Sequence, residues 1–471
     1  MQNILPILES IDDFLYYPVL IVVLTFAGIY FSFRTKFAQI RLCAESLRVV
    51  TENPNEKGAI SPFQALMVST ASRVGTGNII GVSTAICLGG PGAVFWMWIL
   101  AVLGGASALV ESTLAQIYKK RDDDGGSYGG PAYYIEQVLH SKFIAVLFSI
   151  FLIATYAFGF NALCSYNLQS TFAAYEFYNA ETTPCIIGLI LALIVAWCLF
   201  GGGKRIVYVT SRLVPLMGVI YVAVAIFLMI LRANELPAVF KLIFDDAFNF
   251  QAIGSGIAGS CLMYGVKRGL YSNEAGVGSA PNAAASADTS HPVKQGLVQM
   301  LSVYIDTILI CSATAFMCLL SGVEANADAA GAKYVQAAIS AEFGTVGPLF
   351  ITFSMILFAF TTLLGNLFYV DNALAFLNNK KMPGKTFLTC YRIICALIIL
   401  AGAVLPMSAA WALADITMAF MTVINIPCII LLGGVVYKAL DDYQRQRREG
   451  KDPVFKAESI GINPDTLDYW K

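Results

Sequence analysis

VGTGNIIG at residues 74–81 and RGLYSNEAGVGSAP at residues 268–281 are glycine-rich polar stretches, and each interrupts a hydrophobic segment midway. An unpaired peptide group is costly in the hydrocarbon core of a bilayer, so non-helical backbone survives there only where protein encloses it or where it lines a cavity. Paired interruptions in the two halves of a membrane protein are the best indication in a sequence of a binding site near the midplane. The two stretches therefore predict such a site.

The composition is that of a membrane protein. Of 471 residues, 57% are apolar and 13% are charged, and that charged fraction is about half that of a soluble domain. The first apolar run follows the acidic stretch ESIDD and precedes no small-residue cleavage site, so we expect a retained helix rather than a signal peptide. The eleven cysteines lack zinc-ligand spacing and are expected to be small core residues.

Eleven apolar stretches approach the length of about 20 residues that a bilayer requires. They are predicted near residues 14–33, 63–86, 93–118, 143–174, 184–200, 206–231, 251–281, 295–320, 346–377, 387–405 and 411–437. An odd number of spans places the two termini on opposite sides of the membrane.

The basic residues indicate which side is which, because short cytoplasmic loops accumulate Lys and Arg. With the N-terminus outside, 23 of the 30 Lys and Arg residues fall in interior segments. Exterior segments hold only Arg232, Lys241 and Lys333. We expect an exterior N-terminus and a cytoplasmic C-terminus.

The interruptions fall in the second and seventh predicted spans. Without the leading helix, two sets of five spans remain, and an odd number inserts the second set upside down. An inverted five-plus-five repeat with a broken first helix in each half is the LeuT-type architecture. The fold class is therefore an all-α membrane protein, with an accessory region 1–62, repeats at 63–231 and 251–437, and a basic cytoplasmic tail at 438–471.

Several stretches together resemble the alanine/glycine:cation symporter family across nearly the whole chain. They are GTGNIIGV, GGPGAVFWMW, YGGPAYYIE, RGLYSNEAGVGSAP and YIDTILICSATA. The resemblance implies a prokaryotic plasma-membrane carrier that couples sodium, or protons, to the uptake of small neutral amino acids. No enzymatic activity, organic cofactor, nucleic acid or obligate protein partner is implied.

A zwitterionic substrate needs donors for its carboxylate and acceptors for its ammonium group, and exposed peptide groups at helix breaks supply both. We expect Thr76, Gly77 and Asn78 to face the carboxylate. The ammonium group and side chain are expected to face Gly269, Ser272 and Asn273 of the second break. Gln169 is added as a further donor, mainly from its position in the family.

Sodium is a hard cation that prefers oxygen ligands. The resemblance to LeuT-type transporters implies a sodium site at Ala71, Val74, Phe358, Thr361 and Thr362, which joins carbonyls of the first break to hydroxyls of the ninth span. The alternative for the two threonines is ordinary, since a Thr in a membrane helix often bonds its own preceding carbonyl.

The chain departs from the family at Asn366, within TTLLGNLFYVDN, where relatives commonly carry a tryptophan. A carboxamide in place of an indole would enlarge a pocket and favour a larger or more polar substrate such as glutamine, asparagine or serine. Alternatively, a neighbouring side chain fills the space and selectivity is unchanged. The last span, ADITMAFMTVINIPCII, also lacks the usual asparagine-rich pattern.

Ionisable residues at membrane depth are costly, so they are expected to pair or to line water. They are Arg73, Glu111, Lys267, Arg268, Glu274, Asp306 and Asp415. We expect Glu111 to pair with Arg73 and Glu274 with Arg268, in structural or gating roles, while Asp306 is a candidate proton carrier. Neither histidine, His140 or His291, is assigned a function.

Other classes of function find no support in the sequence. VGTGNIIG departs from the dinucleotide fingerprint in the position of its third glycine and lacks a βαβ unit. An enzyme would need a nucleophile with its base or a metal cluster, and a channel would need a filter repeated about an axis. The basic tail is expected to be a solvated end near anionic lipid.

Overall fold

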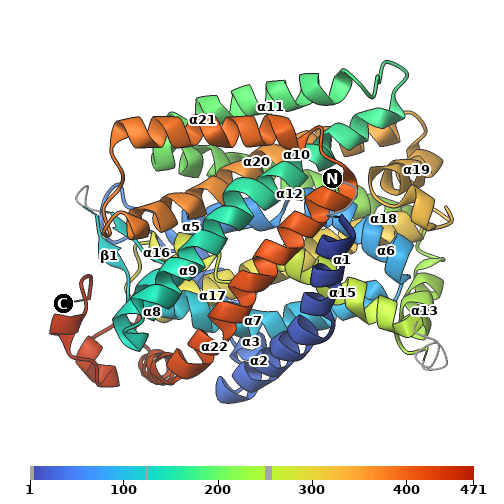
Figure 1. Cartoon of the computed structure of the whole chain (residues 1–471). Helices are drawn as coiled ribbons and strands as arrows, with labels where there is room; N and C mark the ends of the chain where they lie inside the picture. The colour runs from blue at the N-terminus through green and yellow to red at the C-terminus, as the bar shows by residue number, and fades with distance from the viewer. Residues whose placement is uncertain (1–4, 123–125, 250–256, 471) are drawn as a thin grey trace.

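The computed structural model describes residues 5–122, 126–249 and 257–470, and within them the fold is a bundle of α-helices with one two-stranded hairpin (Figure 1). The hairpin pairs β1 (Lys120–Arg121) with β2 (Ser127–Tyr128) in antiparallel register. The first residues of the predicted span 251–281, up to 256, lie outside the described residues.

Within the described residues, eight helices are long and apolar enough to cross a membrane. Three of them are composite: α1 (Leu5–Phe14), η1 (Leu15–Leu20) and α2 (Ile21–Arg34); α9 (Lys142–Ile153), η3 (Ala154–Gly159), α10 (Phe160–Ser170) and η4 (Thr171–Ala174); and α17 (Pro292–Val303), η5 (Tyr304–Cys311) and α18 (Ser312–Leu319). The other five are α7 (Ala93–Ile117), α12 (Gly202–Leu231), α20 (Val346–Leu377), α21 (Lys385–Gly402) and α22 (Met407–Arg448).

Two further apolar helices are shorter. One is α11 (Thr183–Leu199), which packs against α21, as Figure 1 shows. The other is the second part of the first interrupted segment, from Gly77 to Gly89. The all-α membrane class is thus confirmed, whereas the count of eleven spans stays a prediction.

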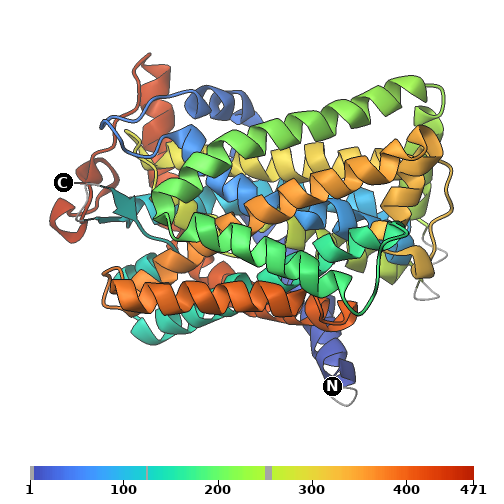
Figure 2. The same cartoon turned by 90° about the horizontal axis from the view of Figure 1, so that it is seen from above.

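Short elements gather at the two ends of the bundle. The described short elements outside the interrupted segments are α3 (Ala38–Arg41), α4 (Cys43–Val50), α8 (Pro131–Leu139), α13 (Leu236–Ala247), α19 (Ala332–Phe343), η6 (Ala327–Ala329), η7 (Ala457–Ile460) and η8 (Pro464–Thr466). In Figure 1, α13 and α19 lie at one end, and the hairpin lies with the C-terminus at the opposite end. Figure 2 shows the same separation from above.

The C-terminal tail, residues 449–470, folds back onto the end of the bundle that carries the hairpin. The indole of Trp470 donates to the Gln116 carbonyl at 2.7 Å, and Phe455 N donates to the Ser290 carbonyl at 2.9 Å. The ammonium group of Lys119 lies 3.7 Å from the ring centroid of Tyr469, a cation–π geometry. The tail beyond the basic stretch is therefore docked, whereas Arg445, Arg448 and Lys451 of the basic stretch itself are exposed.

Candidate functional site

The first break separates α5 (Pro62–Arg73) from the π-helical turn η2 (Gly77–Gly81) and α6 (Val82–Gly89). The side chain of Asn78 holds the break open, because Gly75 N donates to Asn78 Oδ1 at 2.8 Å. The Ala71 carbonyl therefore does not receive the N–H that a continuous helix would supply. Asn167 Nδ2 donates to the Thr76 hydroxyl at 3.0 Å, so Thr76 is anchored to α10.

The second break lies later than the sequence suggested. Helix α15 runs from Ile257 to Asn273, and non-helical backbone follows until α16 (Pro281–Ala285). Gly276 and Gly278 adopt φ of 85° and 89°, a left-handed conformation that glycine adopts readily. Those two glycines, together with Glu274 at φ 52°, end the helix.

This placement changes the roles expected of three residues. Gly269 and Ser272 belong to α15, not to the break, and Asn273 is its last residue. A Cβ at Gly269 would lie 3.2 Å from a methyl group of Leu100 in α7, so this glycine permits close helix packing. Asn273 Oδ1 accepts from Ala275 N at 3.0 Å and thereby stabilises the turn.

The two interrupted helices run in opposite directions past one another. Ser72, which precedes the first break, donates to Glu274 Oε1 at 3.1 Å, at the start of the second break. At the other end, a Cβ on Gly81, which follows the first break, would lie 3.8 Å from Cδ of Arg268, which precedes the second. The breaks thus lie side by side inside the bundle.

A single carboxylate, that of Asp306 in η5, joins the two interrupted helices. Asn78 Nδ2 donates to its Oδ1 at 2.6 Å, and the hydroxyls of Ser272 and Thr307 each donate to Oδ2 at 2.8 Å. The side chain is fully buried. Three donors satisfy both oxygens, which compensates for the burial of a charge.

Aromatic rings enclose the first break. The ring of Tyr271 lies so close to Gly77 that any Cβ there would overlap it. Its centroid is 4.6 Å from that of Phe160 and 4.9 Å from that of Trp411. These three rings come from α15, α10 and α22, so they form an apolar wall beside the buried backbone of the break, as is typical of a small-ligand site.

The two threonines of α20 differ in their surroundings. Thr361 donates to the Leu357 carbonyl at 2.9 Å and lies 3.5 Å from the sulfur of Met217 in α12. Its hydroxyl therefore bonds a carbonyl of its own helix, which is the ordinary alternative to a sodium ligand. Thr362 faces the break: a Cβ on Gly75 would overlap its hydroxyl. Among the described residues, that buried hydroxyl has no hydrogen-bond partner.

The remaining expected sodium ligands flank this hydroxyl. Ala71 and Val74 end α5 at the break, and all of Ala71, Val74 and Phe358 are buried. The carbonyl of Phe358 accepts from the Thr361 hydroxyl at 3.2 Å. The Thr362 hydroxyl therefore lies at Gly75, directly after the end of α5 where Ala71 and Val74 stand. An oxygen ligand in that place is of the kind that a hard cation prefers.

Gln169 lies on the side of the site that faces the α19 end. It lines a cavity of about 460 Å³ together with Asn167, Tyr178 and residues of the loop that precedes α19. Its Oε1 accepts from the Tyr178 hydroxyl at 3.0 Å. The cavity reaches Asn167, which in turn holds Thr76, so it approaches the first break.

Asn366 is fully buried next to the first break. Its Oδ1 lies 2.7 Å from Ser72 Oγ, whose one proton it shares with Glu274 Oε1, and its Nδ2 donates to Asn161 Oδ1 at 3.0 Å. Ser72 belongs to α5 and Asn161 to α10, so a row of polar groups connects α5, α10 and α20 at Asn366.

The charged residues pair differently from expectation. Among the described residues Arg268 pairs with Asp415 at 2.7 Å, and Glu274 instead accepts from Ser72 and Ser279. Glu111 accepts from Asn425 Nδ2 at 2.9 Å, and no ion pair with Arg73 is formed in the described part of the chain. The guanidinium of Arg268 also stacks on Trp411 at 3.8 Å, which explains its preference for the α22 side.

Several residues of the site were not identified from the sequence. Asn161 and Asn167 lie in α10 with Gln169, and the unusual density of polar residues in FNALCSYNLQS could have identified them. Ser72 and Trp411 contribute through contacts between distant segments, which no local pattern reveals.

Comparison with known proteins identifies relatives along the full chain. The model of the sodium:alanine symporter family matches residues 1–457. The probable sodium/glutamine symporter GlnT of Bacillus subtilis is 43% identical, over 100% of this chain and 97% of the relative. The sodium/alanine symporter AgcS of Methanococcus maripaludis is 34% identical, over 95% and 99%.

A solved structure shows the same fold. The crystal structure of MhsT in complex with L-phenylalanine aligns with a TM-score of 0.53 at 14% identity, and it covers 88% of this chain and 93% of the other. At this identity the likeness concerns the fold alone.

Proposed function

Because the chain belongs to the sodium:alanine symporter family, we propose that it imports small neutral amino acids of the alanine and glycine class, driven by sodium, by alternating access. The observation that carries the proposal is the meeting of two interrupted helices at Asp306. Such a junction lets one substrate contact both helices and so respond to their relative movement.

The substrate would lie against the first break. Peptide N–H groups near Thr76, Gly77 and Asn78 face the carboxylate in this proposal, and the positive end of the helix that follows favours an anion. Ser272 and the carbonyls near Asn273 accept from the ammonium group. Gln169 stands at the entrance, on the cavity that leads toward Thr76.

Sodium is the co-transported ion of the proposal. Its ligands are the Ala71 and Val74 carbonyls and the Thr362 hydroxyl, which has no partner of its own. Thr361 and Phe358 shape the helix next to it. With sodium at the end of α5, its charge offsets the negative dipole end of that half-helix, so ion and break stabilise one another.

A second candidate substrate is glutamine, or another amino acid with a polar side chain. Two observations favour it: Asn366 forms a row of polar groups with Ser72 and Asn161 beside the break, and the relative at 43% identity is named a probable sodium/glutamine symporter. A carrier built to bond a carboxamide discriminates strongly against analogues that leave those groups unpaired.

The proposed topology places the N-terminus outside and the C-terminus in the cytoplasm, with inverted repeats at 63–231 and 251–437. The α19 end, which carries the 460 Å³ cavity, then faces outward.

The test is uptake of labelled alanine into proteoliposomes with and without an inward sodium gradient, with excess unlabelled glycine, serine, asparagine or glutamine as competitors. Sodium-driven uptake that glycine inhibits best supports the first candidate. Strongest inhibition by glutamine or asparagine supports the second. Uptake that is indifferent to sodium would refute the coupling.

A further inference from the structure

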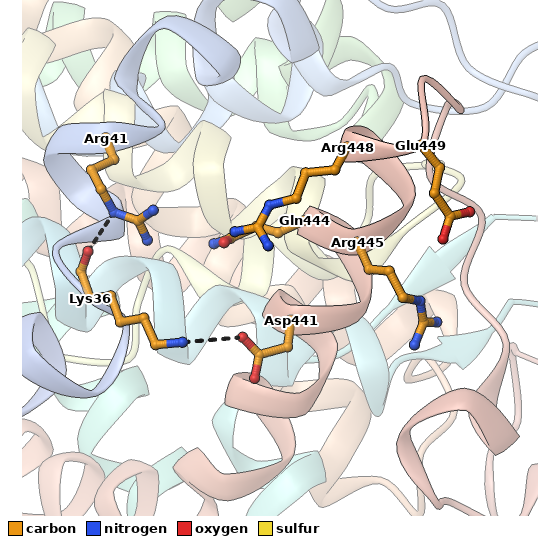
Figure 3. A pocket seen from close by; sticks show the side chains of 7 residues that line it. All are labelled: Lys36, Arg41, Asp441, Gln444, Arg445, Arg448 and Glu449. Atoms are coloured by element: carbon orange, nitrogen blue, oxygen red, sulfur yellow. Dashed lines mark hydrogen bonds and ion pairs between the residues drawn. The ribbon is translucent and has the colours of Figure 1, made fainter.

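A second hollow lies far from the helix breaks, where the end of α2 meets the last turns of α22. Its volume is about 330 Å³, and Figure 3 shows the side chains that line it. They are Lys36, Arg41, Asp441, Gln444, Arg445, Arg448 and Glu449. Four cations and two carboxylates give the lining a formal net charge of +2.

The carboxylates of this hollow already have partners. Asp441 lies 4.0 Å from the ammonium group of Lys36, and Glu449 lies 2.7 Å from Lys451, outside the lining. Arg445 pairs with Asp442 on its own helix. The cations that remain are Arg41 and Arg448.

Those two guanidinium groups have no carboxylate partner within the described part of the chain. Arg41 donates to the backbone carbonyl of Lys36 at 2.5 Å and to that of Thr35 at 3.4 Å. In Figure 3 the side chains of Arg41 and Arg448 reach into the hollow from different elements. A guanidinium fork matches the oxygens of a phosphate group, which it binds through two parallel hydrogen bonds.

The surroundings of the hollow are those of a bilayer surface. Phe33, Phe37 and Ile40, which flank Lys36 in sequence, are exposed by 67%, 41% and 59%. Large apolar side chains in such exposed positions indicate contact with lipid. Basic residues directly beside an apolar surface indicate the level of the lipid headgroups.

We propose that this hollow binds the phosphate of an anionic phospholipid, with Arg41 and Arg448 as its ligands. The net charge of +2 suits a phosphodiester with one negative charge, and the flanking phenylalanines lie against the acyl chains. Inorganic phosphate shares the anionic chemistry but lacks the apolar part.

The test uses the purified full-length protein and native mass spectrometry, with short-chain phosphatidylglycerol, phosphatidylcholine and inorganic phosphate as separate probes. The wild type is expected to retain phosphatidylglycerol in preference to phosphatidylcholine. Each cation near a membrane surface strengthens anionic-lipid binding by about fivefold, so Arg41→Gln/Arg448→Gln is expected to weaken phosphatidylglycerol binding by about 25-fold.

Two further variants make the result specific. Lys204→Gln/Lys385→Gln removes the same charge from exposed positions outside the hollow and is expected to leave binding unchanged. Arg41→Lys/Arg448→Lys keeps the charge but not the guanidinium fork. Its affinity for phosphatidylglycerol is expected to lie between that of the wild type and that of Arg41→Gln/Arg448→Gln. Three results would overturn the proposal. They are equal binding of both lipids by the wild type, a loss of phosphatidylglycerol binding in the Lys204 and Lys385 control equal to that in Arg41→Gln/Arg448→Gln, and displacement of the lipid by millimolar phosphate.

Discussion

Asn78 Nδ2 lies 2.6 Å from Oδ1 of Asp306, so the first interrupted helix is bound directly to η5. The other oxygen of the same carboxylate accepts from Ser272 of the second interrupted helix. A movement of one interrupted helix relative to η5 therefore stretches a charge-assisted hydrogen bond at Asp306, so this carboxylate links the two breaks, in addition to the direct contact between Ser72 and Glu274.

The first prediction concerns that link. Asp306→Asn keeps the volume but removes the charge, and it places a neutral carboxamide against the donors Asn78 and Ser272. Loss of a buried charged hydrogen bond costs about 2 kcal/mol, so we expect initial rates of sodium-driven uptake to fall by at least about tenfold. Glu181→Gln, an exposed change in the loop before α11 and outside the cavity, is the control, and uptake by Asp306→Asn equal to it would refute the link.

The second prediction separates the adjacent threonines. Thr362→Val removes a hydroxyl without a partner, whereas Thr361→Val removes one that bonds its own helix. We expect Thr362→Val to raise the sodium concentration for half-maximal uptake by about tenfold, which corresponds to about 1.4 kcal/mol, and Thr361→Val to change it by less than about threefold. Equal effects would remove the basis for Thr362 as the ligand.

The third prediction concerns selectivity at Asn366. Asn366→Trp fills the polar row formed with Ser72 and Asn161, and we expect inhibition by glutamine to weaken while inhibition by alanine and glycine is retained. Asn366→Ala tests whether hydrogen bonding or volume determines the selectivity among amino acids, because it removes the carboxamide and adds no bulk. If all three proteins show the same order of inhibitors in the uptake assay, Asn366 has no role in selectivity.

A fourth prediction follows from His291, just before α17. Its Nδ1 accepts from Val293 N at 3.2 Å and its Nε2 faces Asp442 at 3.4 Å, so the neutral ring caps the helix. Burial lowers the pKa of His291 below its ordinary value of 6.5. The unfolded chain thus binds this proton first, and the free energy of unfolding falls as pH drops below 6.5.

Thermal unfolding of the detergent-solubilised protein between pH 5 and 8 measures this effect. His291→Asn retains an acceptor for the helix cap but does not titrate, so we expect a flatter dependence of Tm on pH. A slope identical to that of the wild type would assign the pH dependence to other groups.

The positions of the breaks could be predicted from the sequence because glycine clusters in apolar segments have few structural explanations. The predicted position of the first break was close to the observed one, since helix α5 ends at Arg73 and the turn follows directly. The predicted start of the second break was about one and a half helical turns too early in the sequence, because Gly269 serves helix packing against α7. Of the glycines in the second stretch, Gly276 and Gly278 are the two with positive φ, a conformation that favours glycine.

The pairing of buried charges could not be predicted, because it depends on contacts between helices. Arg268 and Asp415 are 147 residues apart, and Arg268 also lies over the ring of Trp411 on the same helix as Asp415. The same holds for Asn161 and Asn366. Local patterns gave the residue types of the site, and the packing of α10, α20 and α22 decided which of them meet.

The contact of the C-terminal tail with the bundle could likewise not be predicted from composition. Most of the charged residues of its basic stretch are exposed, but the aromatic residues Phe455, Tyr469 and Trp470 fix the remainder to the hairpin end of the bundle. Charge counts weigh every residue equally, whereas a few aromatic side chains dominate burial.

The most direct test of sodium-coupled symport is the entry of radioactive sodium into proteoliposomes that contain the wild-type protein, measured with and without external alanine or glutamine. Coupling predicts that one of these amino acids accelerates sodium entry and that Thr362→Val abolishes the acceleration at low sodium. Sodium entry that neither amino acid changes, in proteoliposomes that accumulate that amino acid, would contradict the account.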